Sequence, residues 1–588
     1  MFFDQAESLG DKPFLWAKKD SVYSPTSWRE ADSAVRALAR ALKAQGIRAG
    51  DRVVIISENR PEWAIADLAI IACGAVTVPA YVTNTVADNL YILENCGARG
   101  VICSSAKLLA NALPAATHAA QCEFVIGMEE PEERPTSGLA FLTWQQALLA
   151  GAALDDDVRA MAARRTRNDL ACIIYTSGTG GAPKGVMLSH RALFTNLLSA
   201  HDLLMDIGLG DEVFLSFLPL SHSYEHTCGL FFPISIGAQI YYAEGADTLA
   251  ANLLEARPTI MTAVPRLYEV LHGRILAGVQ RAGGKKLQLF MKALELGRKR
   301  VERPGDLTLM EKAQNLVLDL LVRRKVKQRM GGRLKTFISG GAPLNYEVGM
   351  FFLSLGVKLC QGYGQTEAAP VIACNRPFNI KIATVGPPLL GVEVKIAEDG
   401  EILARGDFVM DGYWDDPEAT ERTVIGGWLH TGDVGVMDAD GYITITDRKR
   451  DIIVISGGDN ISPQRVEGFL TLQPEITQAM VYGDKRPYLV ALIVPAPEFV
   501  ERYARENGAA PDLALLASDK GFRSAIASVI DRVNGTLSQL EKIRRFLIAT
   551  EAFTTDNHMM TPTLKIRRHS IRKDYGDRLD ALYEGKGA

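Results

Sequence analysis

Along most of this chain, segments with apolar residues at helical spacing are followed by short apolar runs that are typical of strands. Residues 28–46, WREADSAVRALARALKAQG, have apolar side chains at helical spacing and end at a glycine, and the apolar run DRVVIIS comes soon after. The same order recurs through GVICSS, EFVIG, ACIIYTSG, EVFLSFLPL, AQIYYAE, TIMTAVP, LKTFISGGAPL and VKLCQGYGQTE. Strands separated by helices usually pair in parallel, so this pattern predicts largely parallel sheets with helices on both faces.

The pattern changes after residue 386. Short alternating runs such as VEVKIAEDGEILARGDFVM are interrupted by turns and predict a mostly antiparallel sheet. From residue 466 to 588 strands are mixed with basic helices, which is enough for a small α+β domain. We therefore predict an α/β protein. Its large N-terminal domain, residues 1–447, would contain parallel-rich sheets and a β-rich subdomain, and residues 448–588 would form a small α+β domain.

Composition restricts the possible functions. With 588 residues, 47% of them hydrophobic and 23% charged, and a net charge of −4, the chain has the composition of a soluble globular protein without a general affinity for nucleic acid. Its eight cysteines are scattered without a C-x-x-C pair, which favours reduced thiols. The start, MFFDQAESLGDKPF, lacks the order of charges of a signal peptide. These features predict a cytoplasmic protein.

One stretch is long enough to be considered as a membrane span. Residues 64–83 form an apolar run of about 20 residues. Asp67, Gly74 and Pro79 interrupt it, so we favour a helix that ends near Gly74 and is followed by the strand AVTVPAYV.

Residues 281–333, the basic block, stand apart by their charge, with fifteen Lys and Arg against five Asp and Glu. Apolar residues at helical spacing run through the block. Two interpretations remain open: solvated basic faces of a helical hairpin, or a surface that docks weakly on anionic lipid head groups at the inner membrane face. In the second case, neutralising Arg323, Arg324, Lys325 and Lys327 would weaken lipid binding.

The stretch 175–186, YTSGTGGAPKGV, follows an apolar strand and is rich in groups that hold phosphate. Its glycines let backbone N–H groups turn inward, its hydroxyls add donors, and Lys184 adds a mobile positive charge. An ordinary surface turn has a similar composition without the lysine. The stretch is not a kinase-type P-loop, because counting from Gly178 places Pro183 at the second glycine and Gly185 at the magnesium-binding hydroxyl.

Further polar, glycine-containing stretches occur in a characteristic order: SGGAPL at 339–344, QGYGQTE at 361–367, GWLHTGD at 427–433, DRKRDIIVISGGDNISP at 447–463 and TPTLKIRR at 561–568. With YTSGTGGAPKG, this order resembles the adenylate-forming enzymes, which include acyl-CoA synthetases, luciferases and the adenylation domains of peptide synthetases. The resemblance extends over nearly the whole chain. With LPLSHSYE and the basic block, the chain looks most similar to the long-chain acyl-CoA synthetases.

This resemblance implies an ATP site made of distant segments. The glycine-rich loop would close on the β- and γ-phosphates, although Gly180 replaces a usual second threonine. Tyr363 would stack on adenine, Thr366 would bond the α-phosphate, and Asp433 and Arg448 would hold the ribose hydroxyls. The implied ATP-binding residues are Thr176, Ser177, Gly178, Thr179, Gly180, Lys184, Gly341, Ala342, Pro343, Tyr363, Gly364, Thr366, Asp433, Arg448 and Lys565.

The resemblance also implies the reaction. A fatty acid carboxylate would attack the α-phosphorus of ATP to give acyl-adenylate and pyrophosphate, and the thiol of CoA would then displace AMP. Glu367 and Thr179 would ligate the Mg²⁺ that accompanies ATP. The implied catalytic residues are Lys565, Thr366, Glu367 and His222.

The small C-terminal domain would be a mobile lid in such an enzyme. It would turn about a hinge at Arg450, withdraw Lys565 after adenylation and bring Gly457 and Gly458 to CoA, where glycine allows a close backbone approach.

Three alternatives remain open. The acyl group could go to the thiol of a carrier protein, which needs the same first half-reaction. The triplet His222, Glu225 and His226 fits H-x-x-E-H, the signature of a zinc hydrolase, although no third ligand is identifiable. The third alternative is a protein that binds nucleotide but catalyses no reaction. The presence of Glu367, Asp433 and Lys565 argues against it.

Overall fold

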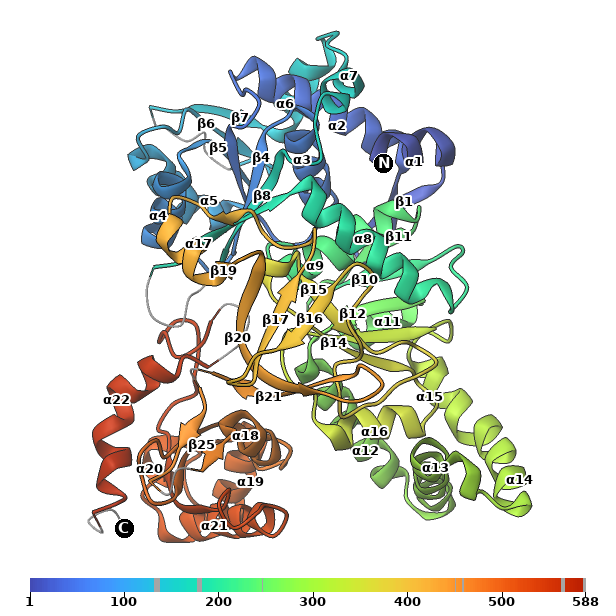
Figure 1. Cartoon of the computed structure of the whole chain (residues 1–588), viewed down its shortest axis with the longest axis vertical. Helices are drawn as coiled ribbons and strands as arrows, with labels where there is room; N and C mark the ends of the chain where they lie inside the picture. Colours follow the sequence, from blue (N-terminus) through green and yellow to red (C-terminus); the bar gives the residue numbers. More distant parts are fainter. Residues whose placement is uncertain are drawn as a thin grey trace.

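A computed structural model gives the structure of the chain. It describes residues 1–131, 138–176, 182–245, 247–449, 451–456, 459–561 and 566–584. Two large mixed sheets and an antiparallel sheet form the upper and middle parts of the molecule in Figure 1, and the C-terminal segment lies at the lower left.

The first large sheet has eight strands in the order β18-β9-β8-β4-β3-β5-β6-β7. The strands from β8 to β7 are parallel, and β9 and β18 add antiparallel at one edge. Their bounds are β3 Arg52–Ile56, β4 Val76–Ala80, β5 Ala98–Cys103, β6 Phe124–Gly127, β7 Ala140–Thr143, β8 Leu170–Thr176, β9 Lys184–Ser189 and β18 Gly412–Tyr413.

The second large sheet has the order β15-β14-β13-β12-β10-β11-β1-β2. It is parallel from β14 to β1, with β15 and β2 antiparallel at its edges. Its strands are β1 Pro13–Lys19, β2 Val22–Ser27, β10 Val213–Ser216, β11 Gln239–Tyr242, β12 Ile260–Ala263, β13 Thr336–Ser339, β14 Leu359–Gly364 and β15 Val371–Cys374. The predicted parallel-rich sheets are confirmed.

Past residue 386 the chain forms the predicted antiparallel sheet. Its five strands are β16 Glu393–Ile396, β17 Glu401–Arg405, β19 Val424–Ile425, β20 Trp428–Met437 and β21 Ile443–Arg448. In the C-terminal segment, a three-stranded sheet of β24 Ile476–Tyr482, β25 Leu489–Pro495 and β26 Ile543–Ile548 packs with α18 Pro463–Thr471, α21 Lys520–Asn534 and α22 Arg568–Ala581. Buried residues from Ile453 onward form clusters of their own, as a separate α+β unit requires.

The apolar run 64–83 is buried α/β structure, as predicted. It contains most of α3, Pro61–Ala72, and all of β4. In the described part of the chain, no helix has both the length and the apolarity that crossing a bilayer would need.

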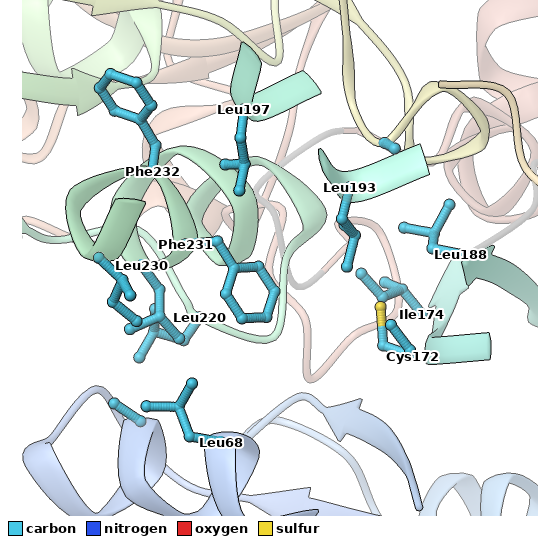
Figure 2. Packing of buried hydrophobic residues seen from close by; sticks show 14 of the residues in the cluster. Leu68, Cys172, Ile174, Leu188, Leu193, Leu197, Leu220, Leu230, Phe231 and Phe232 are labelled. Atoms are coloured by element: carbon cyan, nitrogen blue, oxygen red, sulfur yellow. The ribbon is translucent and has the colours of Figure 1, made fainter. Parts of the chain in front are cut away.

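The main core connects α3 with the segment 220–232. Figure 2 shows Leu68 of α3 beneath Leu220, Leu230 and Phe231, with Leu193 and Leu197 of α8, His190–Met205, above. This packing holds the short helix α9, Ser223–Glu225, and the π-helix η1, His226–Phe231, in a fixed place.

The basic block is helical. It contains the end of α12, Pro265–Ala282, followed by α13, Gly284–Glu302, and then a helix in three parts: α14 Leu309–Leu318, η3 Asp319–Arg323 and α15 Arg324–Arg329. Figure 1 places α14 at the lower right extremity of the molecule.

Candidate active site

Strands β14, β20 and β21 bring three of the expected site residues together. The hydroxyl of Tyr363 on β14 donates a 2.7 Å hydrogen bond to Oδ2 of Asp433 on β20. Asp433 pairs with Arg448 in the β20–β21 register, and Arg448 Nε lies 3.4 Å from Asp433 Oδ1. Burial raises the pKa of Tyr363 well above its usual value, and the charge of Asp433 adds to the effect. The phenol therefore stays protonated and donates to the carboxylate.

A second set of contacts joins Glu367 to Lys184. Glu367 lies in the short helix η4, Thr366–Ala368, which is separated from β14 by Gln365 alone. Its Oε1 accepts a 2.7 Å hydrogen bond from the hydroxyl of Tyr413, and Lys184 Nζ lies 4.9 Å from the centre of the Tyr413 ring. The same Nζ is 3.3 Å from Oδ2 of Asp416. Burial and the charge of Glu367 raise the pKa of Tyr413.

The two ends of the glycine-rich loop are held next to each other. Thr176 ends β8, Lys184 begins β9, and the two residues are antiparallel partners in the sheet. Ser177, Gly178, Thr179 and Gly180 lie outside the described residues. The hairpin therefore fixes where the loop leaves and re-enters the sheet.

Thr366 contacts the segment that carries His222. The hydroxyls of Ser223 and Thr366 are 3.0 Å apart and buried. His222 is the N-cap of α9, and its Nδ1 accepts a hydrogen bond of 3.2 Å from the backbone N–H of Tyr224. This places His222 one residue from Ser223, the partner of Thr366.

The structure explains why two positions of the expected site are occupied by glycine. A Cβ on Gly364 would lie 1.8 Å from the carbonyl oxygen of Pro370, so no side chain fits there. Gly341 has φ +81°, a left-handed backbone conformation that glycine adopts without strain. Ala342 and Pro343 are exposed with it in the loop that follows β13, so a ligand can reach this loop.

The zinc triplet does not converge. Nε2 of His226 is 2.9 Å from Oδ2 of Asp67, whereas Oε2 of Glu225 accepts a 2.8 Å hydrogen bond from Thr262 and His222 caps α9. Within the described ranges, no three His, Cys, Asp or Glu side chains are grouped to hold a metal ion. The geometry therefore does not favour a zinc hydrolase.

Glu367 has an oxygen available for a cation. Its carboxylate is half-buried, and in the described part of the chain Tyr413 bonds Oε1 while Oε2 has no protein partner. A partly exposed carboxylate oxygen is the type of ligand that Mg²⁺ takes, with waters completing its shell. The residues present fit the cation that ATP brings.

Four other expected residues fall outside the described residues: Arg450, Gly457, Gly458 and Lys565. Conversely, the structure adds Tyr413, Asp416 and Ser223 to the site. Tyr413 and Asp416 have no signal in a single sequence beyond the turn composition of DGYWDDP, because β18 reaches the site by pairing with β9, more than 200 positions away. Ser223 stands inside LPLSHSYE, and only the fold shows its contact with Thr366.

Comparison with known proteins identifies the family of this chain. Residues 2–414 match the AMP-binding enzyme family, and residues 450–587 match the AMP-binding enzyme C-terminal domain. This chain therefore belongs to the AMP-binding enzymes, the adenylate-forming family that its motifs resemble.

Curated relatives and solved structures extend over the whole chain. The chain is 34% identical over 574 residues to the long-chain-fatty-acid–CoA ligase FadD15 of Mycobacterium tuberculosis, which covers 96% of this chain and 93% of the relative. It is 30% identical over 595 residues to the peroxisomal long chain acyl-CoA synthetase 6 of Arabidopsis thaliana, covering 96% and 82%. The adenylation domain of a carboxylic acid reductase from Segniliparus rugosus, solved with AMP and a carboxylic acid, shares the fold with a TM-score of 0.78 at 22% identity, covering 99% and 93%.

Proposed function

We propose that this chain is an AMP-forming long-chain fatty acid–CoA ligase. One carboxylate oxygen of the fatty acid attacks the α-phosphorus of ATP, and pyrophosphate leaves. The thiol of CoA then attacks the acyl carbon, loses its proton, and AMP leaves with the electrons of the C–O bond. The observation that carries the proposal is the contact of Tyr363 and Arg448 with Asp433. Four positions after Tyr363, Glu367 is joined through Tyr413 to Lys184. The two relatives described above, named as fatty acid or acyl-CoA ligases, supply the substrate class.

The described residues have distinct roles in this proposal. Asp433 accepts hydrogen bonds from the ribose hydroxyls, and Arg448 holds its carboxylate in place. The Tyr363 ring and the loop of Gly341, Ala342 and Pro343 contact adenine, the former by stacking. The hydroxyl of Thr366 bonds the α-phosphate and is oriented by Ser223.

The phosphate end of the site is positively charged. Lys184 is mobile enough to exchange its ion pair with Asp416 for the β- and γ-phosphates, because both side chains are more than one-third exposed. Glu367 and Thr179 would hold Mg²⁺, which would offset the negative charge of the triphosphate when bound. His222 orients the substrate carboxylate.

The C-terminal part, residues 448–588, alternates between the two half-reactions. Lys565 donates to the reacting oxygens during adenylation, Arg450 is the hinge, and Gly457 and Gly458 approach CoA in the second step. Support comes from the separate hydrophobic clusters of this segment and from its own family match at residues 450–587.

We place the enzyme in the cytoplasm, with the basic block at the inner face of the membrane. The scattered cysteines and the excess of cations in the basic block support this placement.

Exchange of labelled pyrophosphate into ATP tests the proposal directly. The purified chain with Mg²⁺ and a long-chain fatty acid should catalyse exchange without CoA and release acyl-CoA when CoA is added. Asp433→Ala should reduce exchange by at least about a hundredfold. Absence of exchange across a series of acids would disprove the function, and thioester formation with a carrier protein but not with CoA would support the carrier-protein alternative.

A further inference from the structure

The helix formed by α14, η3 and α15 has a large apolar surface on its outer side. Six apolar residues of α14 and η3 have exposed fractions between 43% and 85%: Leu309, Met310, Leu316, Val317, Leu320 and Leu321. We refer to these six residues as the α14 ridge. Their spacing of three, four and seven positions is that of one face of a helix. Soluble monomers rarely expose such a contiguous apolar patch without a function for it.

Packing against the protein does not account for the ridge. The inner side of the same helix is formed by other residues, including Leu318, Val322 and Val326, which are buried in the cluster that contains α13 and α16, Tyr346–Ser354. The helix is therefore apolar on two sides, and only the inner side is packed against the rest of the described protein.

Arg323 belongs to the inner side, so the expectation that it docks on lipid is wrong. It is 2% exposed, and its guanidinium donates to the carbonyl oxygens of Ser354 at 2.8 Å and Ala293 at 2.7 Å. Burial lowers its pKa, while the ion pair with Asp319 at 2.6 Å opposes that effect. Arg323 attaches the helix to its neighbours.

The other cations of the helix remain exposed beside the ridge. Within the described ranges, five exposed cations have no carboxylate within 4.0 Å: Lys312, Arg324, Lys325, Lys327 and Arg329. The two acids of the helix are already paired, Glu311 with Lys299 and Asp319 with Arg300 and Arg323. The surroundings of the ridge are therefore positively charged.

We propose that the α14 ridge inserts into the interface of an anionic lipid bilayer, with Arg324 and Lys325 against the lipid phosphates. An apolar helix face bordered by cations is the pattern of helices that lie in the membrane interface. Figure 1 places α14 at an extremity of the molecule, away from the sheets, and the six ridge residues are exposed there. A second copy of the chain fits less well, because a two-fold interface would bring the same five cations of both copies together. The inference rests on the proposed function in one respect, since a bilayer is where a long-chain fatty acid partitions.

Flotation of the full chain with vesicles tests the proposal. Vesicles of phosphatidylcholine with about 30% phosphatidylglycerol should carry wild-type protein, and vesicles of phosphatidylcholine alone should carry much less. The double variant Leu316→Ser with Leu320→Ser should lose at least about tenfold in partitioning at any salt concentration. Arg324→Gln with Lys325→Gln should lose about tenfold at low salt and little at high salt.

Matched controls separate the ridge from general surface effects. Leu149→Ser with Leu515→Ser removes two leucines that are 62% and 65% exposed elsewhere, and Lys107→Gln with Lys520→Gln removes two exposed cations on other helices. Both control variants should float like wild type. Equal flotation of ridge and control variants would overturn the proposal, as would a wild-type dimer that L316S/L320S converts to a monomer without changing flotation.

Pyrophosphate exchange with a water-soluble acid, measured without vesicles, tests the proposed function independently of membrane binding. The ridge variants should retain wild-type exchange because none of their residues lies in the active site. Absence of wild-type exchange across the whole series of acids would disprove the ligase proposal and leave the flotation result standing, whereas normal exchange without ridge-dependent flotation would disprove the docking proposal alone.

Discussion

The hydroxyl of Tyr363 donates to Oδ2 of Asp433 over 2.7 Å, although the two residues are 70 positions apart in the chain. Arg448 lies against the other oxygen of the same carboxylate at 3.4 Å. One nearly buried carboxylate therefore has a neutral donor on one side and a cation on the other. Both hold it in a single orientation, and the contact also fixes the position of the Tyr363 hydroxyl.

Tyr363→Phe should weaken ATP binding more than it slows the chemistry. The variant keeps the ring for stacking and removes the hydrogen bond to a charged acceptor, which is worth about 1.5–3 kcal/mol. We expect KM for ATP to rise about tenfold, with kcat changed by less than about threefold. Steady-state kinetics provide the measurement. Tyr442→Phe is the control, because Tyr442 donates to the carbonyl oxygen of Asn379 at 2.9 Å, away from the site, and should leave KM for ATP unchanged.

Lys565→Ala should separate the two half-reactions. Loss of a donor used in the adenylation transition state should slow pyrophosphate exchange by at least about a hundredfold. Thioester formation from supplied acyl-adenylate and CoA should stay near the wild-type rate, because in the proposed function Lys565 acts in the adenylation step alone. Equal damage to both steps would refute this role.

Stability should fall as the pH rises through the titration of Glu225. Burial raises the pKa of Glu225 from 4.5 to about 7, so between these values the folded protein holds a proton that the unfolded chain has released. The free energy of unfolding should therefore decrease from pH 4.5 to 7, by up to about 3 kcal/mol for this group, and the loss should remain above pH 7.

Glu225→Gln should remove this dependence, because an amide does not titrate. Denaturant unfolding at several pH values should show a flatter profile for the variant and greater stability above pH 7. Glu506→Gln, at an exposed position, should reproduce the wild-type profile. A Glu225→Gln profile parallel to that of wild type would show that Glu225 is ionised in the folded protein.

Arg568→Met should destabilise the C-terminal segment. Arg568 binds both carboxylate oxygens of Glu467 at 2.6 and 2.7 Å, and both residues are largely buried. Removing one partner leaves a buried charge without compensation, which typically costs about 3–5 kcal/mol. The loss should be visible in chemical unfolding of the full chain, and adding Glu467→Gln should recover part of it.

The exposed pair of Arg486 and Asp580 provides the comparison for this experiment. Its Nη2–Oδ1 distance is 2.6 Å, but both side chains are more than one-third exposed. Arg486→Met should therefore change stability little, since water screens the pair. Similar losses in both variants would mean that burial does not determine the strength of these ion pairs.

Much of the fold was predictable from local patterns. The alternation of helix and strand before residue 386, and the shorter alternating strands after it, correspond to the two parallel-rich sheets and the five-stranded antiparallel sheet. The prediction from Asp67 and Gly74 that residues 64–83 are not a membrane span is confirmed. The structure adds that Asp67 is buried and paired with His226. The expectation that Arg323 contacts lipid was wrong, because Arg323 is buried. Both sides of its helix are apolar, so the spacing of apolar residues does not show which side faces the protein.

The sequence by itself determined the chemistry that this chain can offer: which loops follow strands, which glycines, hydroxyls and charges those loops contain, and the order of motifs that identifies the family. Only the tertiary structure decided which of these groups meet, that Tyr413 and Ser223 join the site, and that the ridge on α14 is left uncovered. The reason is physical. Strand periodicity and loop composition depend on neighbours within a few positions, whereas contacts such as Tyr363 with Asp433 depend on sheet order and on packing between segments that are far apart in the chain.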